Sequence, residues 1–82
     1  MAAVEVKLPA LGEEAGDEAR VSFWYVDVGE PVGPGDDLVQ MLTDKATFDI
    51  PSPVKGKVAR HVAAEDATVR VGQVLCIVES EG

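Results

Sequence analysis

The 82-residue chain has little positive charge and no long apolar run. Its 7 Lys and Arg residues stand against 15 Asp and Glu residues, which gives a formal net charge of -8. Clustered Lys and Arg side chains are what phosphate groups bind, so this composition argues against partners such as nucleic acid or an anionic membrane. The longest apolar runs, such as residues 74–78, are far shorter than the roughly 20 residues that cross a bilayer. We therefore expect no nucleic-acid partner and no membrane.

The chain also lacks the residues of common catalytic and metal sites. It has a single cysteine, Cys76, and a single histidine, His61. One cysteine cannot form an internal disulfide, and the apolar run around Cys76 predicts a buried, unreactive thiol. A nucleophilic triad needs a base, and a zinc site normally uses several Cys and His ligands at short spacing. We expect no catalytic residue and no metal, and a structural or surface role for His61.

The length fits one domain, residues 1–82. The N-terminal residues contain no basic region followed by an apolar one, so we see no secretion signal. A bacterial or archaeal cytoplasm, or a mitochondrial matrix, is the expected location.

Gly and Pro recur every few residues, and β-branched or aromatic residues fill the segments between them, which predicts an all-β fold. The probable strands are residues 4–8, 20–26, 38–43, 46–50, 56–62 and 74–79. Strict alternation would put Val21, Phe23 and Tyr25 on one face of their strand. Trp24 would then lie on the opposite face from Tyr25, so core packing is expected for both rather than ligand stacking.

The two halves of the chain resemble each other. An offset of 72 − 35 = 37 residues matches Gly35 with Gly72 and also matches three pairs of apolar residues, namely Val21 with Val58, Val32 with Val69 and Leu38 with Leu75. Leu8-Pro9 resembles Ile50-Pro51 at an offset of 50 − 8 = 42, which implies about five additional residues in the first half. The excess falls in residues 10–19, a surface loop by composition. The repeat predicts a fold with quasi-two-fold symmetry.

The halves join within residues 41–46, which places Lys45 near the connecting turn. Composition alone favours a solubilising surface lysine. Lys45, however, follows Asp44 at a sharp strand break, where a hairpin turn would present its side chain fully to solvent. Lys55 and Lys57 instead flank Gly56 after a Pro-rich turn. A lysine at a hairpin tip suits covalent modification by another protein.

Four segments carry a family resemblance: "VKLPALGE", "WYVDVGEPVGPGDDL", "TDKATFDIPSPVKGKV" and "VRVGQVLCIVE". From Val4 to about Glu79 the chain resembles the lipoyl domain of 2-oxo acid dehydrogenase complexes, within the biotinyl/lipoyl attachment family. The resemblance implies a flattened β-barrel, or barrel-sandwich hybrid, of two sheets. It also implies that Lys45 becomes amide-linked to lipoic acid, on an arm that reaches about 14 Å when extended.

The resemblance further implies which residues help to present the lysine or to recognise partners. These are Thr43, Asp44, Ala46, Gly29, Glu13 and Glu14, with the loop of residues 10–19 lying near the hairpin. Biotin-carrying relatives typically place methionine on both sides of the target lysine, so the neighbours found here favour lipoate over biotin. Two departures concern the attaching enzyme and the partner complex: Leu42 stands where the family commonly has glutamate, and Gly12-Glu13-Glu14 replaces "GEG".

The implied function is that of a swinging arm, which carries acyl groups and reducing equivalents between the components of such a complex. Implied partners are a 2-oxo acid dehydrogenase, an acyltransferase catalytic domain, a dihydrolipoyl dehydrogenase and a lipoate-attaching enzyme. The domain itself is expected to be a monomeric carrier rather than an enzyme, and its parent chain an acyltransferase of which it forms the N-terminal part. A biotin carboxyl carrier-type domain and an unmodified barrel-sandwich interaction module remain as alternatives.

Overall fold

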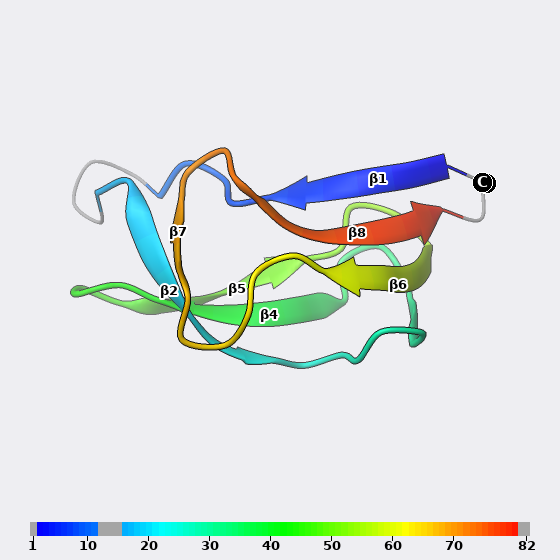
Figure 1. The fold of residues 1–82 in the computed structure, drawn as a ribbon, viewed down its shortest axis with the longest axis horizontal. Coiled ribbons are helices and arrows are strands. Elements are labelled where there is room, and N and C mark those ends of the chain that lie inside the picture. The colour runs from blue at the N-terminus through cyan, green and yellow to red at the C-terminus, as the bar shows by residue number, and fades with distance from the viewer. Residues whose placement is uncertain (1, 12–15, 81–82) are drawn as a thin grey trace.

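The computed structural model describes residues 2–11 and 16–80, which form eight strands and no helix (Figure 1). The strands are β1 (Ala2–Lys7), β2 (Glu18–Trp24), β3 (Pro31–Val32), β4 (Asp37–Leu42), β5 (Thr47–Pro51), β6 (Gly56–His61), β7 (Thr68–Arg70) and β8 (Val74–Ser80). The described residues accordingly contain no helix that could span a membrane. The all-β prediction is confirmed, and the six predicted strands are present with ends shifted by up to two residues. The short strands β3 and β7 were not predicted.

The strands form two four-stranded antiparallel sheets with matching orders. One sheet runs β1-β8-β6-β3 and the other runs β5-β4-β2-β7. Replacing β1 by β5, β8 by β4, β6 by β2 and β3 by β7 converts the first order into the second. This relation is the quasi-two-fold symmetry that the repeat predicted, and the two sheets form the predicted flattened barrel.

Hydrogen bonds from the turns after β2 and β6 to a strand of the other sheet obey the same symmetry. The N–H of Gly29 donates to the carbonyl oxygen of Val58 at 2.7 Å, and the N–H of Asp66 donates to that of Val21 at 2.8 Å. The two donor residues are 37 positions apart in the sequence, and so are the two acceptor residues. Gly29 and Asp66 also share a positive φ, of 94° and 69°. The 37-residue offset therefore describes the backbone of β2 and β6 and of the turns that follow them.

The second offset, 42 residues, is wrong. Ile50 pairs with Val39 of β4, and Val6 pairs with Cys76 of β8. Because Val39 and Cys76 are equivalent under the 37-residue offset, the counterpart of Ile50 is Val6, at an offset of 50 − 6 = 44. The first half thus carries 44 − 37 = 7 additional residues before β2 rather than about five. The resemblance of Leu8-Pro9 to Ile50-Pro51 was local and did not follow the strand register.

A β-bulge in β2 changes the predicted faces of this strand. The register between β2 and β4 shifts around Ser22, and an equivalent shift between β6 and β8 occurs around Ala59. One additional residue reverses the alternation of side chains. As a result Val21 is fully buried, whereas Phe23 and Tyr25 are 37% and 42% exposed. The prediction that these three residues share one face is therefore wrong.

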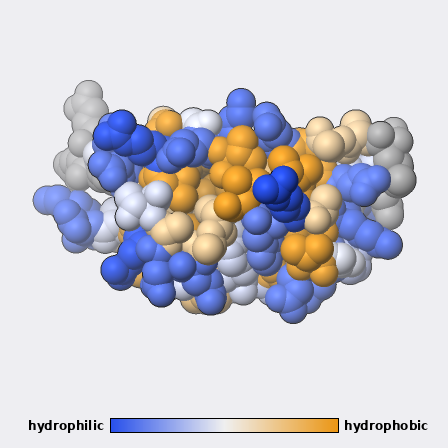
Figure 2. Space-filling model, in the orientation of Figure 1, coloured by the Kyte–Doolittle hydropathy of each residue, from blue (hydrophilic) through white to orange (hydrophobic). Residues whose placement is uncertain are grey.

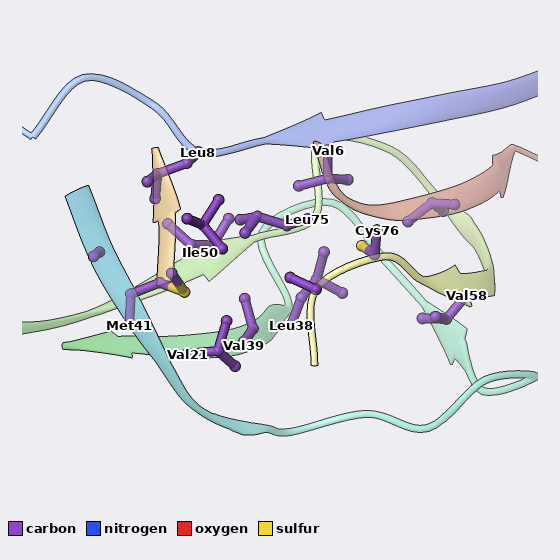
Figure 3. Packing of buried hydrophobic residues seen from close by; sticks show 14 of the residues in the cluster. Val6, Leu8, Val21, Leu38, Val39, Met41, Ile50, Val58, Leu75 and Cys76 are labelled. Atoms are coloured by element: carbon purple, nitrogen blue, oxygen red, sulfur yellow. The ribbon is translucent and has the colours of Figure 1, made fainter. Parts of the chain in front are cut away.

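The core lies between the sheets and draws equivalent residues from both (Figure 3). Leu38 and Val39 of β4, and likewise Leu75 and Cys76 of β8, are all fully buried. Two consecutive residues point inward in each strand because Leu38 and Leu75 are the additional residues at register shifts. Complete burial of each such side chain stabilises the fold by about 1.5–3 kcal/mol. This shared core holds the β4–β5 hairpin in place.

Trp24 and His61 are also equivalent, and they stack on each other. Their ring centroids lie 3.9 Å apart with an interplanar angle of 9°, and Trp24 Nε1 donates a hydrogen bond of 3.0 Å to the carbonyl oxygen of Ala63. His61 Nε2 is buried without a hydrogen-bond partner among the described residues. The prediction of core packing is confirmed for Trp24, which is half-buried against the core, and is wrong for the exposed Tyr25. His61 has the structural role that was expected.

Candidate functional site

The β4–β5 hairpin ends in a tight turn organised by the side chain of Thr43. The N–H of Thr43 donates to the carbonyl oxygen of Ala46 at 2.9 Å. The Thr43 hydroxyl donates to the same oxygen at 3.1 Å and accepts from the N–H groups of Lys45 at 3.2 Å and Ala46 at 3.0 Å. A threonine hydroxyl offers one donor and two acceptor sites, so its hydrogen-bonding capacity is used completely. The turn thus has a defined shape although it lies in solvent.

Lys45 occupies the exposed tip of this turn, as predicted, together with Asp44 and Ala46. Neither of the two central turn residues has a positive φ, so the turn differs from the primed types that usually close two-residue hairpins. Among residues 2–11 and 16–80, no ion pair involves the Lys45 ammonium group. The side chain is therefore accessible to another protein without any unfolding of the domain.

A polar hollow lies on one side of the hairpin. Its volume is about 520 Å³, and its described lining joins residues 16–20 to Leu42, Thr43, Asp44 and Thr68. Asp17, Glu18, Arg20 and Asp44 bring four charged side chains to this described lining. Here the C-terminal part of the loop predicted near the hairpin, residues 16–19, does lie beside it.

An apolar hollow of about 330 Å³ also adjoins the hairpin. Residues 9–11, which follow β1, form one wall, and residues 46 and 48–51 form the other, with Thr43 at the turn. Leu11 and Phe48 are partly buried and pack against the core. Among the described residues of this lining, Asp49 alone is charged. The hairpin that bears Lys45 therefore has environments of opposite polarity beside it.

A polar and aromatic network lies on the outer face of the sheet that contains the hairpin. The Tyr25 hydroxyl donates a hydrogen bond of 2.7 Å to Asp49, and Gln40 donates one of 3.4 Å to the Tyr25 oxygen. Phe23 contacts the Tyr25 ring edge-on, with centroids 4.8 Å apart. The hydrogen bond to Asp49, followed by desolvation and the negative charge of Asp49, raises the pKa of Tyr25. Sequence analysis missed this network because Tyr25 and Asp49 lie 24 residues apart and the bulge that exposes Tyr25 has no clear sequence signal.

Gly29 was predicted to help present Lys45 or recognise partners. Its hydrogen bond, however, goes to Val58 and not to the β4–β5 turn. It occupies the turn between β2 and β3 and donates to Val58 of the opposite sheet. Its positive φ of 94° is the conformation that glycine adopts most easily. A role in partner recognition stays a prediction for Gly29. Glu13 and Glu14 lie outside the described residues.

The described residues contain no group of three or more His, Cys, Asp or Glu side chains that could hold a metal ion. Cys76 is buried in β8, as expected, and burial raises the pKa of its thiol to about 11. A thiol with such a pKa is almost entirely protonated near neutral pH and is a poor nucleophile. The surface is mainly hydrophilic at the hairpin end, with apolar residues gathered nearer the middle of the face in Figure 2. The chemical group that stands out in the described structure is the amine of Lys45.

Known proteins share this fold and sequence pattern. The family described as "Biotin-requiring enzyme", which covers biotin and lipoyl attachment domains, matches residues 4–78. A dihydrolipoyllysine-residue succinyltransferase component of the 2-oxoglutarate dehydrogenase complex from Bartonella vinsonii subsp. berkhoffii is 42% identical over 76 residues. That match covers 93% of this chain and 18% of the relative, so the chain spans about a fifth of the relative's length.

Two solved structures show the same architecture. The lipoyl domain of the 2-oxoglutarate dehydrogenase complex from Azotobacter vinelandii superposes with a TM-score of 0.75 at 28% identity, covering 96% of this chain and 99% of that domain. Kluyveromyces lactis urea carboxylase gives a TM-score of 0.81 at 16% identity over 96% of this chain and 6% of that enzyme, which shows the fold alone. The chain therefore belongs to the biotinyl/lipoyl attachment family, and within that family it is a lipoyl domain.

Proposed function

We propose that Lys45 becomes amide-linked to lipoic acid and that the domain carries acyl groups between the components of a 2-oxo acid dehydrogenase complex. The observation that carries this proposal is the exposed lysine at the tip of a hydrogen-bonded turn, on a hairpin fixed by a shared core. A modified side chain needs both accessibility and a rigid base, and the turn provides both. The lipoyl group, when bound, supplies a disulfide that accepts electrons and an acyl group.

The residues present fit this group. Amide formation requires access to the Lys45 amine, and the small side chain of Ala46 leaves one side of the lysine open. The amide removes the positive charge of Lys45, so a neutral, largely apolar arm would extend about 14 Å from the tip. The protein then acts by position rather than by catalysis, because a tethered group replaces diffusion by a high local concentration. The domain is a carrier in this proposal, and we assign no catalytic role to its described residues.

Lipoate is favoured over biotin by the neighbours of the lysine. Asp44 and Ala46 stand where biotin carriers typically have methionine, as the sequence resemblance implies. The relative from Bartonella and the Azotobacter domain both belong to 2-oxoglutarate dehydrogenase complexes. Other relatives belong to pyruvate and branched-chain complexes, so 2-oxoglutarate is the first of three acids to test. A biotin carrier and an unmodified interaction module remain the alternatives to be tested.

The proposal gives the domain four kinds of partner. A lipoate-attaching enzyme would modify Lys45, a 2-oxo acid dehydrogenase would acylate the arm, an acyltransferase domain would remove the acyl group, and a dihydrolipoyl dehydrogenase would reoxidise the dithiol. We place the domain at the N-terminal part of a longer acyltransferase chain, in a bacterial or archaeal cytoplasm or a mitochondrial matrix.

Partner recognition would use the residues that surround the tip. Thr43 shapes the turn, and Asp44 and Ala46 flank the lysine on the exposed surface. Once Lys45 is uncharged, Asp44 dominates the electrostatics of the tip and would favour a basic surface on the partner. Replacing Asp44 should therefore slow acylation of the arm without unfolding the domain.

Intact-mass spectrometry of the domain tests the proposal in two steps. The domain is produced with lipoate and a lipoate-attaching enzyme, then mixed with a 2-oxoglutarate dehydrogenase component and 2-oxoglutarate. We expect a lipoyl-sized increment in the first step and a succinyl-sized increment in the second. Lys45→Arg should lose both increments, whereas the matched control Lys55→Arg should keep them.

Each other outcome identifies an alternative. An increment only with a biotin-attaching enzyme would replace the proposal by a biotin carrier. No increment with either enzyme would make the chain an unmodified module. Lipoylation followed by acylation from pyruvate or a branched-chain 2-oxo acid, but not from 2-oxoglutarate, would keep the carrier function and change its substrate.

A further inference from the structure

The apolar hollow along β5 begins directly beside the lysine. Ala46 follows Lys45 in the chain and lies at one end of the hollow, and Pro51 lies at the other end of β5. β5 is the edge strand of its sheet. The wall that faces it is the segment after β1, with Pro9 and Leu11. A flexible group attached to Lys45 thus starts at the entrance of this hollow.

The walls of the hollow are apolar and are supported from behind. Leu11 and Phe48 are partly buried against the core, and Ile50 is only 3% exposed. Side chains that pack against the core cannot collapse into the hollow without losing those contacts. A space of about 330 Å³ with such a lining is costly to keep filled with water, and it favours an apolar occupant.

We propose that this hollow receives the lipoyl arm of Lys45 when no partner enzyme holds it. The inference rests on the proposed function, because it requires the modified lysine. A strand rises about 3.3 Å per residue, so the path from Ala46 to Pro51 is about 17 Å long. An arm of about 14 Å therefore spans most of the hollow from its entrance. The unmodified lysine would stay outside, since its charged amine would lose hydration in an apolar space.

The two hollows differ in a way that decides where the arm rests. The described lining of the polar hollow contains Asp17, Glu18, Arg20 and Asp44, which would lose hydration if an uncharged hydrocarbon chain covered them. The described lining of the hollow beside β5 contains one charged residue, Asp49, whose carboxylate accepts the hydrogen bond from Tyr25. The arm rests along β5, and its disulfide ring lies among apolar side chains instead of in water.

This arrangement gives the carrier a resting state. In the hollow, the disulfide is shielded from thiols in solution. A partner enzyme that binds the hairpin competes with the hollow for the arm and releases the disulfide at its own catalytic centre. Shielding and release both follow from one equilibrium between the hollow and solvent.

Nuclear magnetic resonance on the ¹⁵N-labelled domain tests the resting state directly. Four forms are compared, with Lys45 unmodified, acetylated, octanoylated or lipoylated, and the mass of each form is confirmed first. Acetylation should shift only the amide signals of the turn, residues 43–47. The octanoyl and lipoyl forms should also shift the signals of Leu11, Phe48 and Ile50. Lipoyl-induced shifts confined to the turn would overturn the inference.

A reactivity measurement uses matched variants. Tris(2-carboxyethyl)phosphine converts the disulfide into two thiols and is itself oxidised to the phosphine oxide with an oxygen from water. If about two thirds of the arms rest in the hollow, reduction should be about threefold slower than for free lipoamide. Leu11→Ser should abolish this protection, and Glu18→Gln in the polar hollow should preserve it. Equal rates for the native domain and free lipoamide would contradict the resting state.

The two proposals fail separately. A chain that gains no lipoyl mass refutes the proposed function. A chain that is lipoylated and acylated, but shows neither distant shifts nor protection, remains a carrier whose arm stays in solvent, and only the resting state is refuted.

Discussion

The two halves of the molecule share an interior and differ at their ends. In the first half, β4 continues into β5 through a turn of residues 43–46, and this turn bears Lys45. The 37-residue offset places the equivalent of Thr43 at Ser80, the last residue of β8. Figure 1 shows the hairpin tip and the end of β8 at opposite ends of the long axis. One architecture thus places a tight turn with an exposed lysine at one end of the molecule and the last residue of β8 at the other.

The surfaces of the halves have diverged more than their cores. Val21 and Val58 are both buried, but Tyr25 corresponds by the same offset to Val62, and Gln40 to Ile77. The half that bears the lysine therefore carries the hydrogen-bonded network of Tyr25, and the other half lacks its counterpart. We infer that core residues shared by the two halves serve folding, whereas surface residues that differ between the halves are candidates for function.

We expect the largest loss of stability from a substitution at a buried position where the two halves have different residues. Gly56 is equivalent to Ala19, yet a Cβ atom on Gly56 would overlap with the backbone carbonyl of Glu79. Gly56→Ala should therefore lower the free energy of unfolding by about 3 kcal/mol, because neither strand can move without disturbing the core. The reverse change, Ala19→Gly, should cost about 1 kcal/mol. Urea denaturation of both variants checks this order, and equal losses would contradict the asymmetry.

The hydroxyl of Thr43 organises the β4–β5 turn, and its equivalent in the other half is Ser80 at the end of β8. Thr43→Val keeps the shape of the side chain but removes the hydroxyl that bonds to Lys45 and Ala46. Unfolding free energy should fall by about 1 kcal/mol, and lipoylation should become slower because the lysine loses its fixed base. Thr43→Ser is the matched control and should behave like the native chain. A Thr43→Val domain with native stability and native modification rate would show that the hydroxyl does not hold the turn.

Cys76 and Val39 occupy equivalent buried positions. Because the first half already accommodates valine there, Cys76→Val should change stability by less than about 1 kcal/mol. In the native domain the thiol, whose pKa burial raises to about 11, should react with a maleimide near neutral pH only after unfolding. Rapid labelling of the folded domain would contradict this burial.

The smallest effect concerns the network that only one half carries. The pKa of Tyr25 is raised chiefly by its hydrogen bond to Asp49. Asp49→Ala should therefore lower the tyrosine pKa towards 10.0, and Asp37→Asn should lower it less, because Asp37 acts only through its charge. A raised pKa means that the neutral phenol is favoured in the folded state. That contribution is present below about pH 10 and is lost as the pH rises through the folded-state pKa. Absorbance titration of tyrosinate measures each value.

The sequence predicted the repeated core because buried residues recur at a fixed spacing. Leu38 and Leu75, like Val21 and Val58, lie where the 37-residue offset places them. It also predicted the exposed position of Lys45 in the hairpin turn, because a turn signal between two strands is local. The error in the second offset arose from similarity between two dipeptides, which does not report strand register.

Features formed by distant segments could not be predicted in this way. A β-bulge adds one residue without a distinctive composition, so the outward position of Tyr25 was missed. The apolar hollow joins residues 9–11 to β5, and only the folded chain brings these segments together. Strands of two or three residues, such as β3 and β7, are too short for alternation to identify.

The most direct test of the central claim is to locate the modified residue in the chain isolated from its native cells. Peptide mapping by tandem mass spectrometry should find the lipoyl increment on Lys45 and on no other lysine. An increment on Lys55 or Lys57, with Lys45 unmodified, would contradict the claim that the β4–β5 turn presents the attachment site.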